Sequence, residues 1–302
     1  MRELVIIGAG PSGLSAALYG ARAGLDLVVL ESNFMAGGQV LNTYEVDNYL
    51  GMPKVNGFDM GMQFKAHAES LGVEIKSSSV EKIERKEDMY TVYTSEEAID
   101  CKAVLLATGA VSRKLDIPGE DAFRGRGVGY CATCDGAFYR GKVTAVVGGS
   151  YQAVEDAIYL SNICEKVYLI HRRDSLRAGA VLEKELQACA NVEIIWNHIP
   201  MEIKGAEQVE GLLIKDLKTE KETILDVDGV FVAVGTVPTT LLAKDLVEMD
   251  EFGYIIAGET CETSLPGFFV AGDIRTKPLR QIITAVADGA NAVTAAQNYL
   301  KK

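Results

Sequence analysis

The chain has 302 residues, with 30 Lys and Arg against 42 Asp and Glu, and 48% of its residues are hydrophobic. This length favours about two domains. The net charge of −12 argues against a nucleic-acid or membrane-surface partner, which would require concentrated positive charge. No apolar run approaches the roughly 18 residues of a membrane helix, and MRELVIIGAG lacks the pattern of a signal peptide. We therefore expect a cytoplasmic protein with reduced thiols.

Residues 4–31 form the first predicted unit, an apolar strand, a glycine-rich turn, an alanine-rich helix and a second apolar strand. This βαβ order predicts a parallel sheet covered by helices. Gly8, Gly10 and Gly13 form a GxGxxG turn that allows a pyrophosphate to approach the helix N-terminus. Glu31 ends the second strand, where a carboxylate can accept hydrogen bonds from ribose hydroxyls. The first unit is therefore predicted to bind a dinucleotide.

The segment 130–136, YCATCDG, contains a CxxC pair, Cys131 and Cys134. Two cysteines at this spacing can form a redox-active disulfide, and a passive structural disulfide is the less favoured alternative. A zinc site would need two more ligands, and the sequence has neither a second CxxC nor an HxxxH, so we predict no metal. Asp135 follows directly and could transfer the proton that thiol exchange requires, or could serve only as a turn residue.

Residues 143–173 repeat the βαβ pattern, and the registers agree. Glu31 lies 23 positions after Gly8, and His171 lies 23 positions after Gly148. The second strand ends in a basic cluster instead of an acid: His171, Arg172, Arg173 and Arg177. Since the planar guanidinium donates paired hydrogen bonds to phosphate, this cluster favours an NADP-type site over a merely solvated helix start.

The turn of this second unit departs from the simple glycine rule. It reads Gly148, Gly149, Ser150, Tyr151, so a side chain occupies the position of the second glycine, and a large ring begins the helix. A Cβ at this point crowds the pyrophosphate, and the ring could gate cofactor entry or only pack. The identity of the electron donor therefore stays open at this point.

Three further apolar strands end at glycine, in residues 103–111, 229–238 and 267–275. Asp273 follows the last of them, at the edge of a parallel sheet where ligands bind, so it is expected to bind a ribityl or ribose hydroxyl; an ordinary helix N-cap is the alternative. The predicted fold class is α/β, with two Rossmann-like dinucleotide-binding domains. We expect the second domain, residues 114–245, to be inserted into the first, residues 1–113 and 246–302.

Together these motifs resemble the low-molecular-weight thioredoxin reductases over nearly the whole chain. The resemblance rests on GAGPSG at 8–13, GGQ at 37–39, EVDN at 45–48, ATG at 107–109, CATCDG at 131–136, HRRD at 171–174, AGD at 271–273 and RQ at 280–281. It implies FAD in the first domain, NADPH in the second, a homodimer, and reduction of thioredoxin or a thioredoxin-like protein.

The resemblance also assigns roles to individual residues. Cys134 would face the flavin, Cys131 would attack the substrate disulfide, and Asp135 would be the acid/base. The FAD-binding positions would be Gly8, Gly10, Pro11, Ser12, Gly13, Glu31, Gly37, Gly38, Gln39, Asn48, Thr108, Gly109, Gly272, Asp273, Arg280 and Gln281. The NADPH-binding positions would be Gly148, Gly149, Ser150, Tyr151, His171, Arg172, Arg173 and Arg177. If the altered turn did not bind NADPH, the alternatives would be a ferredoxin-dependent flavin thioredoxin reductase or an FAD-dependent dithiol oxidase.

Overall fold

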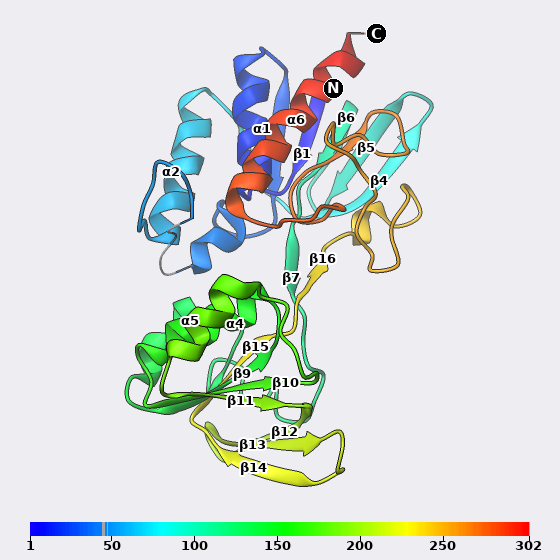
Figure 1. Ribbon diagram of the computed structural model, residues 1–302. Helices are drawn as coiled ribbons and strands as arrows, with labels where there is room; N and C mark the ends of the chain where they lie inside the picture. Colours follow the sequence, from blue (N-terminus) through cyan, green and yellow to red (C-terminus); the bar gives the residue numbers. More distant parts are fainter. Residues whose placement is uncertain (44–45, 47, 302) are drawn as a thin grey trace. The chain divides into compact units, whose positions relative to one another are not determined.

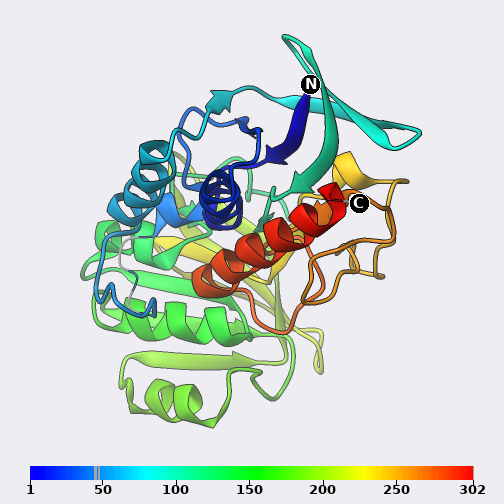
Figure 2. The ribbon, with the colours of Figure 1, turned by 90° about the horizontal axis from the view of Figure 1, so that it is seen from above.

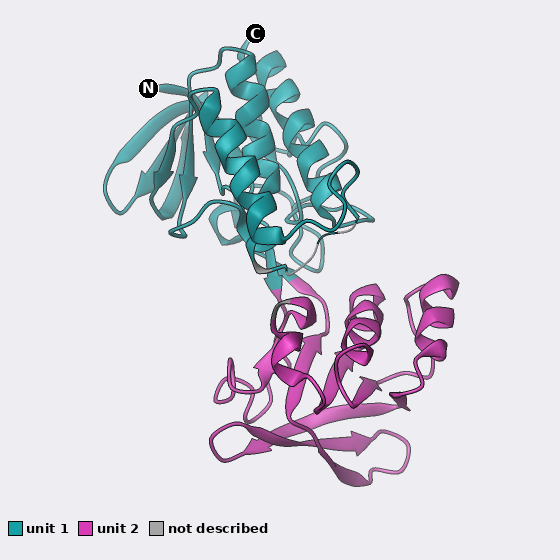
Figure 3. Ribbon diagram, turned by 90° about the vertical axis from the view of Figure 1, so that its left-hand side faces the viewer, with its two compact units in different colours: residues 1–111, 237–302 teal, residues 112–236 magenta. Residues whose placement is uncertain are grey.

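The computed structural model describes residues 1–43, 46 and 48–301, apart from the side chains of Asn42 and Cys134. Of the EVDN motif, Glu45 and Asp47 thus lie outside the described residues. The chain divides into two units: unit 1 comprises residues 1–111 and 237–302, and unit 2 comprises residues 112–236 (Figure 3). Each contains a parallel sheet with helices packed on it. The predicted fold class, two Rossmann-like domains with the second inserted into the first, is confirmed.

Unit 1 is built on a seven-stranded sheet in the order β3-β2-β1-β6-β5-β4, with β17 also paired to β6 (Figure 1). The parallel strands are β1 (Arg2–Ile7), β2 (Leu27–Glu31), β3 (Ile75–Ser77), β6 (Ala98–Leu106) and β17 (Phe268–Val270). Strands β5 (Met89–Thr94) and β4 (Val80–Lys86) continue the sheet, with β5 antiparallel to β6 and β4 antiparallel to β5. The long β6 pairs with β5 through its first half and with β17 through its second.

The apolar side chains of β1 point alternately to the two faces of the sheet, and they contribute to two core layers of unit 1. Leu4 and Ile6 face helices α1 (Pro11–Arg22) and α6 (Ile282–Leu300), which lie side by side (Figure 2). Val5 and Ile7 face the opposite layer, which includes the 3₁₀ helix η3 (Leu241–Ala243). Helix α2 (Gly57–Ser70) packs beside α1. Because successive side chains of a strand point to opposite faces, one apolar strand supplies both layers.

Unit 2 contains a five-stranded parallel sheet in the order β11-β10-β9-β15-β8. Its strands are β8 (Val128–Gly129), β9 (Val143–Gly148), β10 (Lys166–His171), β11 (Val192–Trp196) and β15 (Gly229–Ala233). One face packs on α4 (Tyr151–Ser161) and α5 (Ala180–Ala188). The other packs on an antiparallel sheet of β12 (His198–Gly205), β13 (Val209–Asp216) and β14 (Glu222–Asp226).

Two paired strands, β7 (Ala110–Ser112) and β16 (Thr236–Pro238), carry the chain between the units. The second crossing lies before residue 237, whereas the sequence placed it after residue 245. The physical reason is that Ala243 is fully buried in the second core layer of unit 1, and that Thr239 hydrogen-bonds to Gly109 and Thr108. No helix in the described part of the chain is long and apolar enough to cross a bilayer.

Candidate active site

The predicted first-domain motifs meet at one edge of the unit 1 sheet. The GxGxxG turn follows β1, Glu31 ends β2, Thr108 and Gly109 follow β6, and Gly272 and Asp273 follow β17. All these strands are parallel. In open parallel sheets, ligands bind beyond the carboxyl ends of the strands. The structure therefore brings together, at a ligand-binding edge, residues that are up to 265 positions apart in the sequence.

The GxGxxG turn has the close packing that its glycines predict. Gly8 has φ +103°, and a Cβ there would lie 2.4 Å from the carbonyl oxygen of Ala107. A Cβ on Gly13 would lie 1.9 Å from the carbonyl oxygen of Gly8. Gly10 differs, because the nearest atom to a Cβ there is 3.8 Å away. Helix α1 then begins at Pro11 with no acidic residue in its first turn, so its N-terminus is open to phosphate.

The glycine pair at positions 37 and 38 packs directly against this turn. The Gly37 amide donates to the Ala9 carbonyl at 2.7 Å. Gly38 has φ +64°, and a Cβ there would approach the Gly10 Cα to 2.9 Å. Gln39 follows in the 3₁₀ helix η1 (Gly38–Asn42). The two glycine-rich segments thus form one cradle, in which a Cβ at Gly8, Gly13 or Gly38 would collide with backbone atoms.

Glu31 is 6% exposed, and its carboxylate is already engaged with the protein. One oxygen accepts the Ala9 amide at 2.7 Å, and the other accepts the backbone and side-chain nitrogens of Asn33, both at 2.8 Å. An ionised carboxylate offers about four acceptor positions, so one is left for a ribose hydroxyl. Glu31 therefore holds the turn in addition to the ligand role that its position predicts.

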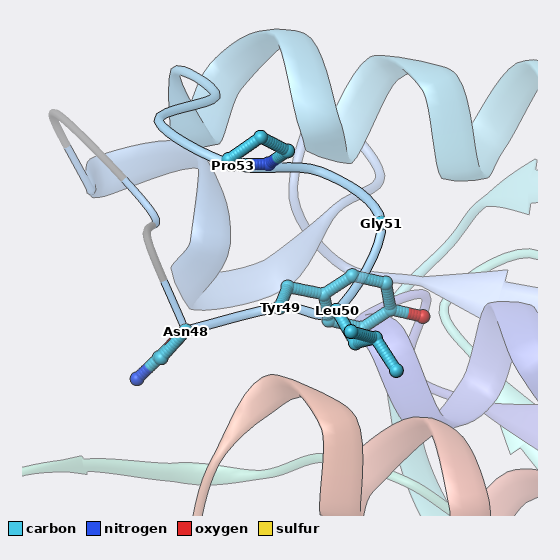
Figure 4. A pocket seen from close by; sticks show the side chains of 5 residues that line it. All are labelled: Asn48, Tyr49, Leu50, Gly51 and Pro53. Carbon is cyan, nitrogen blue, oxygen red and sulfur yellow. The ribbon is translucent and has the colours of Figure 1, made fainter.

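Arg280 and Ser12 contact the loop that carries Gly272 and Asp273. Arg280 donates to the Asp273 carbonyl at 3.3 Å and stacks over the ring of Tyr254 at 3.8 Å. The Asn48 side chain donates to Gln281 at 3.1 Å, which joins the 48–53 loop to the start of α6. Asn48 also lines a surface hollow with Tyr49, Leu50, Gly51 and Pro53 (Figure 4). Ser12 of α1 faces Gly272, where a Cβ would lie 2.6 Å from its hydroxyl oxygen.

Two buried side-chain oxygens in the described part of the chain lack a hydrogen-bond partner, Ser78 Oγ and Asp273 Oδ1. Both lie at the carboxyl edge of the unit 1 sheet, Ser78 after β3 and Asp273 after β17. Four strand spacings separate β3 from β17, which is about 19 Å at about 4.8 Å per spacing. Buried polar atoms require partners, so this edge fits an extended ligand with polar groups at both ends, as FAD has. Sequence reasoning missed Ser78; its place after the strand adjoining the Glu31 strand was the available signal.

Thr108 and Gly109 also bind the segment of chain that returns from unit 2 to unit 1. The Thr108 hydroxyl donates to the Thr239 carbonyl at 2.7 Å, and the Thr239 amide donates to the Gly109 carbonyl at 3.0 Å. Gly109 has φ +69°, a conformation that favours glycine. These bonds fix the segment that follows β16 to the end of β6.

In unit 2, the Gly148–Gly149 turn is as tightly packed as the first one. A Cβ on Gly148 would lie 2.3 Å from the Ala233 carbonyl oxygen, and a Cβ on Gly149 would lie 2.2 Å from the His171 ring. Ser150 follows with φ −86° and caps α4 without a side-chain hydrogen bond. Since that backbone conformation is open to any residue, Ser150 introduces no backbone strain.

His171 lies beneath this turn and is 8% exposed. Its Nε2 lies 3.0 Å from the Ser175 carbonyl, and its ring meets Trp196 edge-on at 6.2 Å. Burial lowers the pKa of His171, so the imidazole is neutral at pH 7. His171 thus shapes the turn and the loop after β10.

The three arginines of the basic cluster are exposed around that turn: Arg172, Arg173 and Arg177. Among the described residues, none of the three has an ion-pair partner. The Arg177 amide donates to the Gly149 carbonyl at 2.8 Å, which holds this residue beside the glycine turn. The cluster is therefore free to bind an anion next to the N-terminus of α4.

Tyr151 is the first residue of α4 and is 49% exposed. The negative charge of Glu155, one helical turn further on, raises the pKa of Tyr151. The ring therefore stands in solvent at the end of the helix where a pyrophosphate would bind.

The redox motif lies on the short helix α3 (Ala132–Asp135). Cys131 precedes the helix and accepts the Asp135 amide on its carbonyl at 3.2 Å, while its Sγ lies 3.4 Å from the Thr133 hydroxyl. The side chain of Cys134 lies outside the described residues. Ala132 anchors the helix in the core of unit 2 with no exposed surface.

Asp135 is half-buried, and its carboxylate faces Gly129 of β8. A Cβ on Gly129 would lie 3.0 Å from Asp135 Oδ2 and 3.3 Å from the Phe231 ring. Burial raises the pKa of Asp135. A carboxyl group with a raised pKa holds a proton closer to neutrality and is better suited to proton transfer.

An exposed aromatic residue follows the redox motif in the 3₁₀ helix η2 (Gly136–Tyr139). Phe138 is 76% exposed, whereas its neighbour Tyr139 packs edge-on against Phe231 at 5.3 Å. Phe138 is therefore a large apolar side chain that lies in solvent four positions after Cys134. Sequence reasoning missed Phe138, because Phe and Tyr adjoin there and the sequence does not indicate which ring is buried.

Comparisons with known proteins agree with this geometry. The sequence pattern of the pyridine nucleotide-disulphide oxidoreductases matches residues 2–289. The thioredoxin reductase of Listeria monocytogenes is 41% identical over 99% of this chain and 94% of its own length. The Clostridium pasteurianum protein named "34.2 kDa protein in rubredoxin operon" is 42% identical over 99% and 97%. The crystal structure of Lactococcus lactis thioredoxin reductase is 39% identical, with a TM-score of 0.93, over 100% of this chain and 99% of its own.

The chain therefore belongs to the pyridine nucleotide-disulphide oxidoreductase family. Within that family, its full-length similarities are to thioredoxin reductases, which confirms the resemblance drawn from the sequence. The predicted enzyme class, a flavoprotein disulfide reductase, is confirmed by the same similarities.

Proposed function

We propose that this enzyme reduces the disulfide of thioredoxin or a thioredoxin-like protein with electrons from NADPH. The balanced reaction converts NADPH, one proton and a protein disulfide into NADP⁺ and a protein dithiol. One combination of motifs carries the proposal. Unit 2 contains the CxxC motif and a nucleotide-binding turn with a basic cluster, and unit 1 contains a second nucleotide-binding turn with an acidic residue, Glu31. The runner-up donor, reduced ferredoxin, is an outcome of the test below.

FAD is proposed to bind the cradle of unit 1. Gly10 leaves space for the pyrophosphate, and the N-terminus of α1 supplies amide donors. Ser78, Glu31 and Asp273 would bind polar groups along the edge. Arg280, which donates to the Asp273 carbonyl, and the hydrogen-bonded pair Asn48 and Gln281 would add further contacts. When bound, the flavin accepts a hydride from the nicotinamide and passes an electron pair to a disulfide.

NADPH is proposed to bind the turn of unit 2. The three exposed arginines of the basic cluster would hold the 2′-phosphate, because they carry positive charge without an ion-pair partner among the described residues. Ser150 and Tyr151 begin α4, where the pyrophosphate would lie. Tyr151 would have to turn aside for the cofactor, and its exposed ring leaves room to do so.

The exchange chemistry is assigned to Cys131, Cys134 and Asp135. The Cys131 thiolate would attack the substrate disulfide, and Cys134 would resolve the resulting mixed disulfide and release the dithiol substrate. Asp135 would donate the proton that the leaving thiolate needs. The proposal is supported by the state of the sulfurs: Cys131 is disulfide-bonded, whereas Cys101, Cys164, Cys189 and Cys261 are free.

A homodimer and a cytoplasmic location complete the proposal. The four free cysteines suit a reducing compartment. Sedimentation equilibrium of the FAD-bound protein tests the dimer, and a mass of one chain would exclude it.

The test is an anaerobic titration of the FAD-bound protein, followed at the flavin absorption band. NADPH is expected to bleach the flavin, and addition of an oxidised thioredoxin is expected to restore the colour. Cys131→Ser and Cys134→Ser should each abolish thioredoxin reduction and retain FAD, whereas the control Cys189→Ser should behave as the wild type. Bleaching by reduced ferredoxin, and not by NADPH, would overturn the donor assignment. Turnover in either CxxC variant would remove the motif from the mechanism.

A further inference from the structure

The guanidinium of Arg280 is held at the carboxyl edge of the unit 1 sheet by two hydrogen bonds and one stacking contact. Its Nε donates to the Asp273 carbonyl at 3.3 Å, and its Nη2 donates to the Arg275 carbonyl at 3.2 Å. Its flat face lies over the Tyr254 ring, with 3.8 Å between Cζ and the ring centroid. Among the described residues, no hydrogen bond occupies Arg280 Nη1 or the buried Asp273 Oδ1. A donor and an acceptor are therefore left for a polar ligand at this edge.

The stacking contact is the closest-fitting of the three. Both hydrogen bonds of Arg280 lie at or beyond the long end of the usual N–H···O range of about 2.7–3.2 Å, so each is weak. The ring contact, in contrast, is well within the roughly 6 Å over which a cation and an aromatic face attract each other. The other cation–ring contacts of the described residues are longer, at 4.4–5.7 Å. The orientation of the guanidinium therefore depends mainly on Tyr254.

The backbone fixes Tyr254 on both sides of its ring. On the N-terminal side, Asp250 Oδ1 accepts the Tyr254 amide at 2.9 Å, and the Asp250 amide donates to the Tyr254 carbonyl at 2.9 Å. On the C-terminal side, the Ile255 amide donates to the Ile274 carbonyl at 3.0 Å. The Ile255 carbonyl accepts the Thr276 amide at 2.9 Å. The ring is therefore anchored to the same loop after β17 that the guanidinium contacts.

We propose that Tyr254 is a positioning residue that holds Arg280 in its ligand-binding orientation before the cofactor binds. This inference rests on the proposed binding of FAD to unit 1. It goes beyond that proposal by assigning a role to a residue that belongs to none of the predicted motifs. A long side chain that becomes immobilised only on binding loses rotamer freedom, and this loss weakens the complex. Because the ring has already immobilised Arg280, FAD binds without that loss.

The inference predicts that the ring of Tyr254 matters for FAD binding. Tyr254→Phe keeps the aromatic face and should bind FAD as the wild type does. Tyr254→Leu removes that face and should raise the dissociation constant about tenfold, or about 1.4 kcal/mol. This change is close to the loss that accompanies immobilisation of one flexible side chain on binding.

The experiment measures the dissociation constant of FAD for the full-length apoprotein by quenching of flavin fluorescence. A double-mutant cycle with Arg280→Met shows whether Tyr254 acts through Arg280, because Tyr254→Leu should then weaken binding by less than about twofold in the Arg280→Met background. The matched control is Tyr168→Leu, which removes the ring 4.4 Å from Lys166 Nζ in unit 2 and should leave FAD binding unchanged. Thermal melting of each apoprotein shows whether it is folded, and Tyr254→Met replaces Tyr254→Leu if that variant is not.

The outcomes separate this inference from the proposal on which it rests. If the wild-type apoprotein does not bind FAD, the proposed function fails and this inference fails with it. If FAD binds normally and Tyr254→Leu binds it as tightly as the wild type, the inference alone is wrong. Equal weakening by Tyr254→Leu with and without Arg280, or equal weakening by Tyr254→Phe, would also overturn it.

Discussion

A buried carboxylate fixes the residue that precedes the redox motif, and this arrangement can be tested quantitatively. Glu120 is 2% exposed and accepts three hydrogen bonds from neutral donors. The Leu115 amide and the Tyr130 hydroxyl donate to one oxygen at 2.9 and 2.7 Å, and the Asp116 amide donates to the other at 2.7 Å. Leu115 lies just past the first crossing, so Glu120 links that segment to Tyr130, the neighbour of Cys131.

Removing one hydroxyl tests the strength of this link. Tyr130→Phe keeps the ring and deletes the donor to Oε1 of Glu120. Hydrogen bonds to charged groups contribute about 1.5–3 kcal/mol, so we expect the free energy of unfolding of unit 2 to fall by about that amount. In a Glu120→Ala background, the same substitution should cost less than about 0.5 kcal/mol, because the acceptor is already absent.

Tryptophan fluorescence provides the assay. The chain has one tryptophan, Trp196, on β11 of unit 2, so urea unfolding followed at this residue reports on unit 2. Tyr168→Phe is the matched control, since it keeps the ring that lies under Lys166 Nζ at 4.4 Å. Lys166 is 39% exposed, so the substitution should change stability by less than about 0.5 kcal/mol. An equal cost of Tyr130→Phe in the presence and absence of Glu120 would refute the reasoning.

Three further predictions follow from local geometry. Gly13→Ala should destabilise unit 1 by at least about 2 kcal/mol, because its Cβ would meet the Gly8 carbonyl. Gly10→Ala should leave the melting temperature unchanged and weaken FAD binding. Equal melting temperatures of the two variants would contradict this prediction. Burial raises the pKa of Asp156 to about 7, so unit 2 should lose stability as pH rises from about 4 to 7, and Asp156→Asn should remove that decline in urea titrations; an unchanged slope would refute it. Phe138→Ala should raise the KM for thioredoxin roughly tenfold and leave turnover of a small disulfide unchanged, with the 97% exposed Phe34→Ala as control; equal KM values would exclude a docking role.

The parts of the site that the sequence predicted are those fixed by backbone sterics. Gly8, Gly13 and Gly148 each lie where a Cβ would collide with a carbonyl oxygen, and such positions leave a glycine in the sequence whatever the surroundings. The parallel pairing of β1 with β2 and of β9 with β10 followed in the same way from the two βαβ patterns. These features are local, so spacing along the chain is enough to predict them.

The parts that the sequence could not predict depend on where side chains meet across the fold. Glu31 bonds to Ala9 as well as facing the ligand edge, and His171 lies beneath its turn instead of joining the exposed arginines. The partnership of Asp288 with Lys277 joins a loop to a helix through side-chain geometry alone. Such contacts have no periodic signature, because either residue could equally have pointed to solvent.

The insertion of unit 2 also sets the order in which the protein can mature on the ribosome. The glycine turn after β1 is synthesised among the first residues, but β17, which pairs with β6, and α6, which packs on α1, emerge among the last. At about 5–20 residues per second, the 161 residues between β6 and β17 take roughly 8–32 seconds to translate. During that interval β6 lacks its neighbour β17, and α1 lacks its neighbour α6. Unit 2 is a continuous stretch of chain, so all of its strands and helices are already synthesised. Nascent chains stalled before residue 268 should consequently depend on chaperones for the N-terminal segment and not for the inserted one.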